Sequence, residues 1–217
     1  MLLTDRMRND IVRCIEMAVR GQEMRECGRE EDGKCGSNNS GRPYHVCGHE
    51  EHNVGRFSIV LDKIEIGGRE YPYSYEKGGD FVVVFPMIED RIILIHQYRH
   101  ALNDWFWELP AGGLGDDTPE EAARRELEEE TGYNVRELIH LNNYPFSLGT
   151  STTYGYYYYA MCTKDGKQHL DATEFIDQVI EVTPRRFEEM ISRNQYIQRE
   201  GIFMWLAWKE MQRIKKQ

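Results

Sequence analysis

Three glutamates, Glu126, Glu129 and Glu130, are the residues of this sequence best placed to do chemistry together. On a helix, 100° per residue puts them within an arc of about 100°, whereas Glu128 points to the opposite side. Like charges at this spacing disfavour the helix slightly, so helix formation does not explain them. A hard divalent cation with oxygen ligands would remove the repulsion. The alternative for an acidic run taken alone is a solvated helix face.

The helix that carries these glutamates is predicted to run from Thr118 to Thr131. Thr118 can serve as the N-cap, Pro119 suits the first helical position, and Glu121 completes a capping box. Gly132 stands where a left-handed residue commonly ends a helix. Residues 110–117, just before the helix, include three glycines that let backbone come close to a ligand or ion. The sequence therefore predicts a glycine-rich loop beside a face of carboxylates.

The run from Arg125 to Tyr133 resembles the second half of the Nudix box, Arg-Glu-apolar-any-Glu-Glu-any-Gly-apolar, at every fixed position. In the first half, Asp117 stands where glutamate is usual. The first glycine of the box corresponds to Gly112, which leaves the loop one residue short. We expect residues 113–115 to absorb this deletion.

Further resemblance, over residues 56–210, is to the ADP-ribose and nucleotide-sugar pyrophosphatase branch of this family. His96–Arg99 and Glu108–Gly112 resemble its Gln-aromatic-Arg and Glu-apolar-Pro-Ala-Gly signatures, and Glu174–Asp177 resembles a loop that supplies another acidic group. The resemblance implies an α+β fold, an α/β/α sandwich with a mixed sheet. It also implies Mg²⁺-dependent hydrolysis, with Mn²⁺ as a possible substitute, of a nucleoside diphosphate joined to a second group. The products would be a nucleoside monophosphate and a phosphorylated second product.

The resemblance assigns roles to particular residues of this chain. The implied metal ligands are the Ala111 carbonyl, Glu126, Glu129, Glu130 and Glu174. Glu129 and Glu174 are also the candidates for the catalytic base, and Arg125 would orient Glu129. The implied substrate-binding residues are Arg99, Glu108, Gly112, Gly113, Leu114 and Tyr73. For Arg99 the alternative is a surface arginine at the end of a strand.

One loop departs from the branch. Ser147-Leu148-Gly149 stands where Ser-Pro-Gly is common, and Thr150–Thr153 lacks the acidic residue usual after it. That loop is expected to contact the part of the substrate beyond the phosphates. ADP-ribose and other nucleotide sugars therefore both remain candidate substrates.

Residues 1–55 are predicted to form an N-terminal extension before a hydrolase domain at 56–217. Apolar spacing predicts a short helix over residues 5–25. Residues 26–55 are polar and read as a linker or a metal-held segment. Cys27, Cys35 and Cys47 with one histidine could hold a structural Zn²⁺, although the spacing fits no standard zinc module. The alternative is a flexible polar arm.

Alternating and turn-bounded runs predict strands and hairpins in the rest of the chain. The predicted strands are 57–66, 69–75, 81–88, 91–98, 105–109 and 154–162, with further helices starting at Thr183 and near Arg199. Tyr71, Tyr73 and Tyr75 share one face of their strand. Together with the resemblance, this predicts a homodimer in which the hairpin of residues 57–75 helps to build the neighbour's substrate site.

The overall charge limits the range of partners. A net charge of −10 argues against general binding to nucleic acid or an anionic membrane. No run reaches the roughly 20 apolar residues of a membrane span, and the start lacks a signal-peptide core, so we expect a cytoplasmic protein with a small-molecule nucleotide-sugar substrate. Two other functions stay open, namely a Nudix-fold module that binds a nucleotide without cutting it and a zinc-organised interaction protein.

Overall fold

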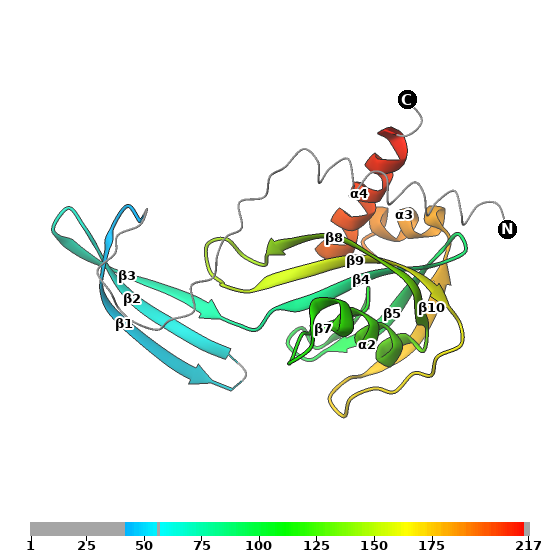
Figure 1. Ribbon diagram of the computed structural model, residues 1–217, viewed down its shortest axis with the longest axis horizontal. Helices are drawn as coiled ribbons and strands as arrows, with labels where there is room; N and C mark the ends of the chain where they lie inside the picture. Colours follow the sequence, from blue (N-terminus) through cyan, green and yellow to red (C-terminus); the bar gives the residue numbers. More distant parts are fainter. Residues whose placement is uncertain (1–41, 56, 215–217) are drawn as a thin grey trace. The chain divides into compact units, whose positions relative to one another are not determined.

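The computed structural model describes residues 42–55 and 57–214 of the 217-residue chain. The predicted helix over residues 5–25, as well as Cys27 and Cys35, lies outside the described residues. By their internal contacts the described residues form two compact units (Figure 1). The larger unit contains residues 79–144 and 154–214, and the smaller contains residues 42–78 and 145–153.

The larger unit is built on a seven-stranded mixed sheet with the order β10-β5-β4-β9-β8, in which β6 pairs with β5 and β7 with β4. β4 pairs with β9 in parallel, while its pairings with β5 and β7 are antiparallel. The strands are β4 (Phe81–Ile88), β5 (Arg91–Arg99), β6 (Asp104–Glu108), β7 (Ala111–Gly113), β8 (Asn134–Pro145), β9 (Tyr154–Thr163) and β10 (Ile176–Val182).

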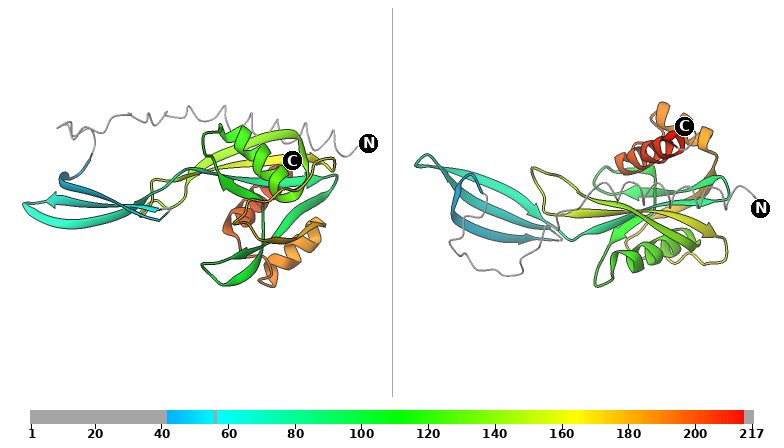
Figure 2. Two further views of the ribbon diagram at one scale, coloured as in Figure 1. Left: turned by 90° about the horizontal axis from the view of Figure 1, so that it is seen from below. Right: turned by 45° about the horizontal axis from the view of Figure 1, so that its top comes forward.

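Helices cover both faces of this sheet (Figure 2). The alternation of side chains along β4 sends Val82 and Val84 to the face packed against α2 (Pro119–Thr131). Phe85 points to the other face, which packs against α3 (Pro184–Ser192) and α4 (Arg199–Ile214). The predicted α+β fold with a mixed sheet and flanking helices is confirmed. None of the described helices is long and apolar enough to cross a membrane.

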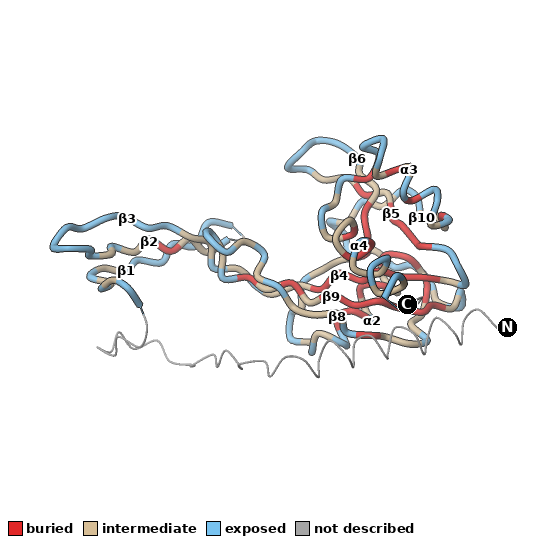
Figure 3. Tube along the Cα trace, turned by 90° about the horizontal axis from the view of Figure 1, so that it is seen from above, coloured by how far each residue is buried: buried red, intermediate tan, exposed pale blue. Residues whose placement is uncertain are grey.

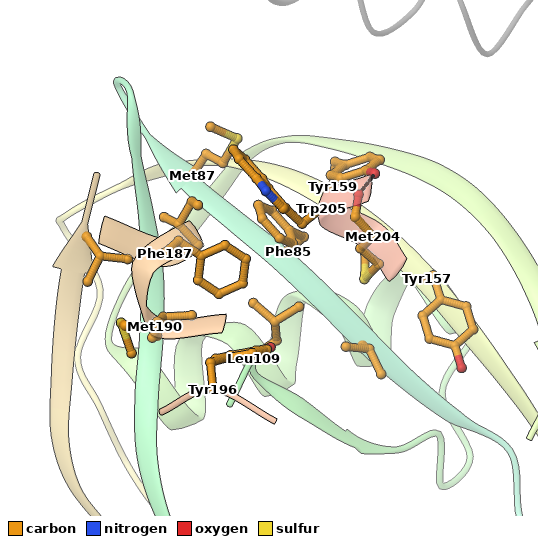
Figure 4. Close-up of a cluster of buried hydrophobic side chains, with 14 of the residues drawn as sticks. Phe85, Met87, Leu109, Tyr157, Tyr159, Phe187, Met190, Tyr196, Met204 and Trp205 are labelled. Carbon is orange, nitrogen blue, oxygen red and sulfur yellow. Dashed lines mark hydrogen bonds between the residues drawn. The ribbon is translucent and has the colours of Figure 1, made fainter. Parts of the chain in front are cut away.

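Aromatic packing dominates the core under α3 and α4 (Figure 4). The Phe85 ring lies 5.7 Å from that of Tyr159, 5.9 Å from that of Phe187 and 6.3 Å from that of Trp205, measured between centroids. The buried hydroxyl of Tyr159 donates to the Met204 carbonyl at 2.6 Å, so this core buries a phenol without losing its hydrogen bond. The rigid sheet that results is the platform for the residues described below.

The smaller unit is an antiparallel sheet of β1 (His45–Val54), β2 (Phe57–Ile66) and β3 (Arg69–Lys77) in that order. Gly67 and Gly68 join β2 to β3 with φ of 57° and 76°, as a two-residue hairpin turn requires. The predicted hairpin is confirmed, and most of the sheet is exposed (Figure 3). The prediction of a linker is wrong for residues 45–54, because β1 pairs with β2 along its whole length.

Candidate active site

The ends of α2 are fixed by its own residues, as the sequence predicts. The Thr118 hydroxyl accepts from the Glu121 amide, and the Glu121 carboxylate accepts from the Thr118 amide at 3.0 Å. Gly132 ends the helix with φ of 74° and donates to the Glu128 carbonyl at 2.8 Å. Both caps are formed by residues of α2 and its immediate neighbours. They fix where the helix begins and ends, and therefore the side of the helix on which each glutamate lies.

Glu126 and Glu130 point from α2 into the larger unit, where Glu174 joins them. One carboxylate oxygen from each lies within 4.8 Å of the others. Glu126 is 5% exposed and Glu130 is fully buried. The Ala111 amide donates to Glu130 Oε2 at 2.9 Å, while Glu130 Oε1 is buried without a hydrogen-bond partner among the described residues.

Burial sets the protonation behaviour of this cluster. Desolvation raises the pKa of Glu130 well above its usual value of 4.5, against the Ala111 amide, which lowers it, and Glu126 and Glu174 raise it further. Desolvation also raises the pKa of Glu126, which Arg125 partly offsets. Three acidic groups with one unpaired buried oxygen fit a hard cation, which would supply that oxygen with a partner and neutralise the repulsion.

Gly112 makes room for the Glu126 carboxylate. A Cβ atom at this position would lie 2.1 Å from both Cδ and Oε1 of Glu126. A side chain at this position would therefore displace the Glu126 carboxylate from its place against the β7 backbone. Gly113 differs, because a Cβ there would meet open space.

Arg125 ties the glycine-rich loop to the helix. Its guanidinium donates to Asp117 at 2.7 Å, to Glu126 at 2.7 Å and to Glu129 at 3.1 Å. It also donates to the Gly113 carbonyl at 3.0 Å. The expected contact with Glu129 is present, and Asp117 serves in this network as a partner for Arg125.

Glu129 lies outside the cluster of three. Its carboxylate contacts Arg125 and lies 3.7 Å from His169 Nε2, and its side chain is 23% exposed. Its predicted role as a metal ligand or base stays a prediction. Glu174 takes the third place in the cluster, although it is 44 residues from Glu130 in the sequence.

Two contacts hold the segment before Glu174 against the end of α2. The His169 amide donates to the Glu129 carbonyl at 3.0 Å, and the Gln168 side chain donates to the Glu130 carbonyl at 2.8 Å. Both satisfy carbonyls that the last turn of a helix leaves without partners. Neither residue carries a signal in the sequence that could have identified this role.

Arg99 and Glu108 form an ion pair between β5 and β6. Arg99 Nε donates to Glu108 Oε1 at 3.0 Å, and Nη2 donates to Oε2 at 2.5 Å. Desolvation lowers the pKa of Arg99, but the Glu108 hydrogen bonds and the charges of Glu130 and Glu174 raise it by more. Glu108 is buried, whereas the Arg99 side chain is 40% exposed and keeps a surface that an anion could reach.

The remaining candidates lie in two places. Leu114 packs at the edge of the core beneath α2, and its amide donates to the Asp80 carbonyl at 3.1 Å. Tyr73 belongs to the smaller unit, where its hydroxyl donates to the Gly149 carbonyl at 2.8 Å. It lines an open pocket of about 230 Å³ in that unit, together with Tyr75, Asp62 and Leu148.

Of the cysteines predicted to hold zinc, the structure describes Cys47. It is exposed, and its thiol donates to the Lys63 carbonyl at 3.3 Å. Within residues 42–55 and 57–214, the group of side chains suited to a metal ion is the glutamate cluster. The zinc hypothesis stays a prediction.

Comparisons with known proteins agree with this geometry. A methanol dehydrogenase activator of Bacillus methanolicus is 35% identical over 158 residues, covering 68% of this chain and 81% of that protein. An ADP-ribose pyrophosphatase of Bacillus subtilis is 37% identical over 98 residues, or 44% of this chain and about half (52%) of that protein.

Structural comparison supports the fold. A crystal structure of an ADP compounds hydrolase superposes with a TM-score of 0.69 at 16% identity, covering 80% of this chain and 96% of that one. The model of the NUDIX domain matches residues 79–202, which include α2 and all three clustered glutamates. The chain belongs to the Nudix family.

Proposed function

We propose that this chain is a Mg²⁺-dependent hydrolase that cleaves the pyrophosphate bond of a nucleoside diphosphate joined to a second group, such as ADP-ribose or another nucleotide sugar. The observation that carries the proposal is the fully buried Glu130, whose Oε1 has no hydrogen-bond partner within residues 42–55 and 57–214 and which lies within 4.8 Å of two more carboxylates. Related pyrophosphatases act on such substrates, which supports the substrate class.

Each residue of the site has a distinct part in this reaction. Glu126, Glu130 and Glu174 would hold Mg²⁺, with the Ala111 carbonyl and Glu129 as further candidate ligands. Bound Mg²⁺ would neutralise the phosphates and lower the pKa of the attacking water. Glu129 or Glu174 would accept the proton of that water.

The substrate contacts are proposed on both sides of the cluster. The exposed part of Arg99, held in place by Glu108, would bind a phosphate. The Gly112-Gly113-Leu114 segment would border the substrate, since it lies beside Glu126 and Arg125. The products would be a nucleoside monophosphate and a phosphorylated second product.

We further propose a homodimer in which Tyr73, from the hairpin of residues 57–75, stacks on the base of the neighbour's substrate. Tyr71 and Tyr73 are 45% and 40% exposed, so their rings are available to a partner. Tyr73→Ala should then raise KM more than it lowers kcat. A monomer by light scattering at micromolar concentration, with full activity, would contradict the dimer.

The test of the function is a hydrolysis screen. The full chain is incubated with ADP-ribose, other ADP-sugars, GDP-mannose and, as a comparison, a nucleoside triphosphate, with Mg²⁺ or with chelator, and the products are separated by ion-exchange chromatography. We expect a nucleoside monophosphate from at least one nucleotide sugar, with Mg²⁺ only. Binding without turnover for every substrate would favour a non-hydrolytic nucleotide sensor instead. The three crowded carboxylates argue against that alternative, because a binding module has no need of them.

A further inference from the structure

The third carboxylate of the cluster does not share a helix with the other two. Glu174 lies in the segment that leads into β10, two residues before Ile176 begins the strand. One of its carboxylate oxygens accepts from the Asp171 amide at 3.0 Å, and its own amide donates to the Asp171 carbonyl at 3.0 Å. The contacts of Gln168 and His169 with the end of α2 hold the segment before Glu174. On the other side, the position of Glu174 depends on how β10 is attached to the sheet.

β10 is attached to β5 through a β-bulge three residues after Glu174. Ile176 pairs with Gln97 and Gln178 pairs with His96, so Asp177 is the extra residue in the ladder. Bulges of this kind redirect a side chain and are frequent beside active sites. Asp177 Oδ1 lies 2.7 Å from His96 Nδ1. Since a carboxylate can only accept, Nδ1 of His96 carries the shared hydrogen.

His96 is itself fixed in orientation. Its ring stacks on Trp105 at 5.3 Å with an interplanar angle of 23°, and lies 4.5 Å from the Trp107 ring. Its side chain is 20% exposed. Next to the Ile176–Gln97 pair, the Tyr98 amide of β5 donates to the Phe175 carbonyl at 2.9 Å. The residues on both sides of Ile176 are therefore held by β5, next to Glu174.

His96 does not belong to the face that carries the phosphate-binding candidate. Along β5, His96 and Tyr98 point to one side of the strand, while Gln97 and Arg99 point to the other. Arg99 is on the side that feels the charges of Glu130 and Glu174. His96 can thus affect the cluster through the backbone of β10 rather than by contact with substrate.

We propose that His96 and Asp177 are positioning residues, whose hydrogen bond fixes the bulge of β10 and thereby holds Glu174 at the metal-binding cluster. This inference rests on the proposed function in one respect, because it takes Glu174 to be a ligand of the catalytic cation. It assigns the aromatic group of Trp105, His96 and Trp107, on the face opposite Arg99, to the support of that ligand.

The test compares Asp177→Ala, which removes the acceptor, with Asp177→Asn, which keeps one. Mn²⁺ binding to the full chain is measured by titration calorimetry, and kcat, KM and the half-saturating Mg²⁺ concentration are measured on the best substrate. We expect Asp177→Ala to weaken Mn²⁺ binding and lower kcat by about 10-fold, with KM changed less than about twofold. Asp177→Asn should recover most of the loss, and His96→Ala should reproduce the effect of Asp177→Ala.

A matched control and a double mutant separate positioning from general stability. Glu181→Gln weakens the other end of β10, where Glu181 accepts from the Tyr133 hydroxyl at 2.7 Å, and it should leave Mn²⁺ binding unchanged. In a Glu174→Gln background, Asp177→Ala should have no further effect, because the group that it positions has already lost its charge. Equal effects of Asp177→Ala with and without Glu174 would overturn the proposal, as would the same loss in Glu181→Gln. If the wild-type chain binds Mn²⁺ but hydrolyses nothing, the proposed function fails while the calorimetric comparison still decides the role of His96 and Asp177.

Discussion

Replacing Glu130 by glutamine should make the metal-free protein more stable while it removes a proposed metal ligand. Glutamine keeps the shape of the side chain and an oxygen that can accept from the Ala111 amide at 2.9 Å. Its amide nitrogen would take the place of Oε1, which lacks a partner among the described residues, and could donate toward Glu126 or Glu174. The substitution thus turns a repulsive contact into an attractive one.

The size of the effect follows from the distances in the cluster. At an effective dielectric constant of about 20, two unit charges 4.8 Å apart repel by about 3 kcal/mol. Wild-type Glu130 can escape this repulsion by binding a proton, which costs about 1.4 kcal/mol for each pH unit above its raised pKa. The gain in chelator near neutral pH should therefore be positive but smaller than about 3 kcal/mol, and it should raise Tm.

The assay is thermal unfolding in chelator and in Mg²⁺, combined with turnover. Wild-type protein should be stabilised by Mg²⁺, because in the proposed mechanism the cation binds the native cluster. Glu130→Gln should lose most of that stabilisation and lower kcat by about 100-fold or more. Glu128→Gln is the matched control, since it removes a partly exposed carboxylate from the same helix without touching the cluster.

Two results would refute this reasoning. If Glu130→Gln is less stable than wild type in chelator, the buried carboxylate is not repelled by its neighbours. If Mg²⁺ stabilises Glu130→Gln as strongly as wild type, the cation does not bind at this cluster. A uniform loss of stability in both Glu130→Gln and Glu128→Gln would point to a general effect on α2.

Three further outcomes are expected. Hydrolysis should stop with chelator and return with Mg²⁺ or Mn²⁺, and full turnover in chelator would contradict the mechanism. The pKa values of Glu126 and Glu130 are raised in the folded state. The stability that these two carboxyl groups contribute is therefore fully present below pH about 4.5, and it is lost as the pH rises through their raised pKa values. Tm measured in chelator should therefore rise as pH falls from about 8 to 5, and excess Mg²⁺ should flatten this slope, since it favours the ionised carboxylates. Gly112→Ala should weaken Mn²⁺ binding and activity by about 10-fold because its Cβ would displace Glu126, whereas Gly79→Ala, where a Cβ meets nothing within 4 Å, should match wild type in both assays.

The parts of the fold that the sequence predicts are those with local signals. α2 follows from Thr118, Pro119 and Gly132, and the hairpin of β2 and β3 follows from its two glycines and flanking alternation. Burial on both faces explains why β4 and β9 are visible as apolar runs. For each of these elements, the residues that determine its structure lie within a stretch of about a dozen residues.

Sequence reasoning missed four strands. One is β7 (Ala111–Gly113), which lies in the predicted glycine-rich loop, and the other three lack such signals. β8 lies at the end of the sheet, and its partly buried residues follow no regular alternation. β10 contains a bulge, which breaks the period of two on which strand recognition relies. β1 is rich in histidine and glutamate and nearly all exposed, so its composition resembles that of a loop. In β8, β10 and β1, strand formation depends on pairing with a neighbouring strand and not on a pattern in the strand's own sequence.

The same distinction separates the site residues that could be found from those that could not. α2 ends in glutamates and has no basic residue in its last turn, although the negative end of a helix dipole favours cations there. Negative side chains at the negative end of a helix do not stabilise it, which indicates that these glutamates have another role. This conflict can be recognised from the sequence alone. Asp177 violates no local preference, and neither does His96. Their partnership exists only because β5 and β10 pair in one register, so the support of Glu174 becomes visible only in the folded chain.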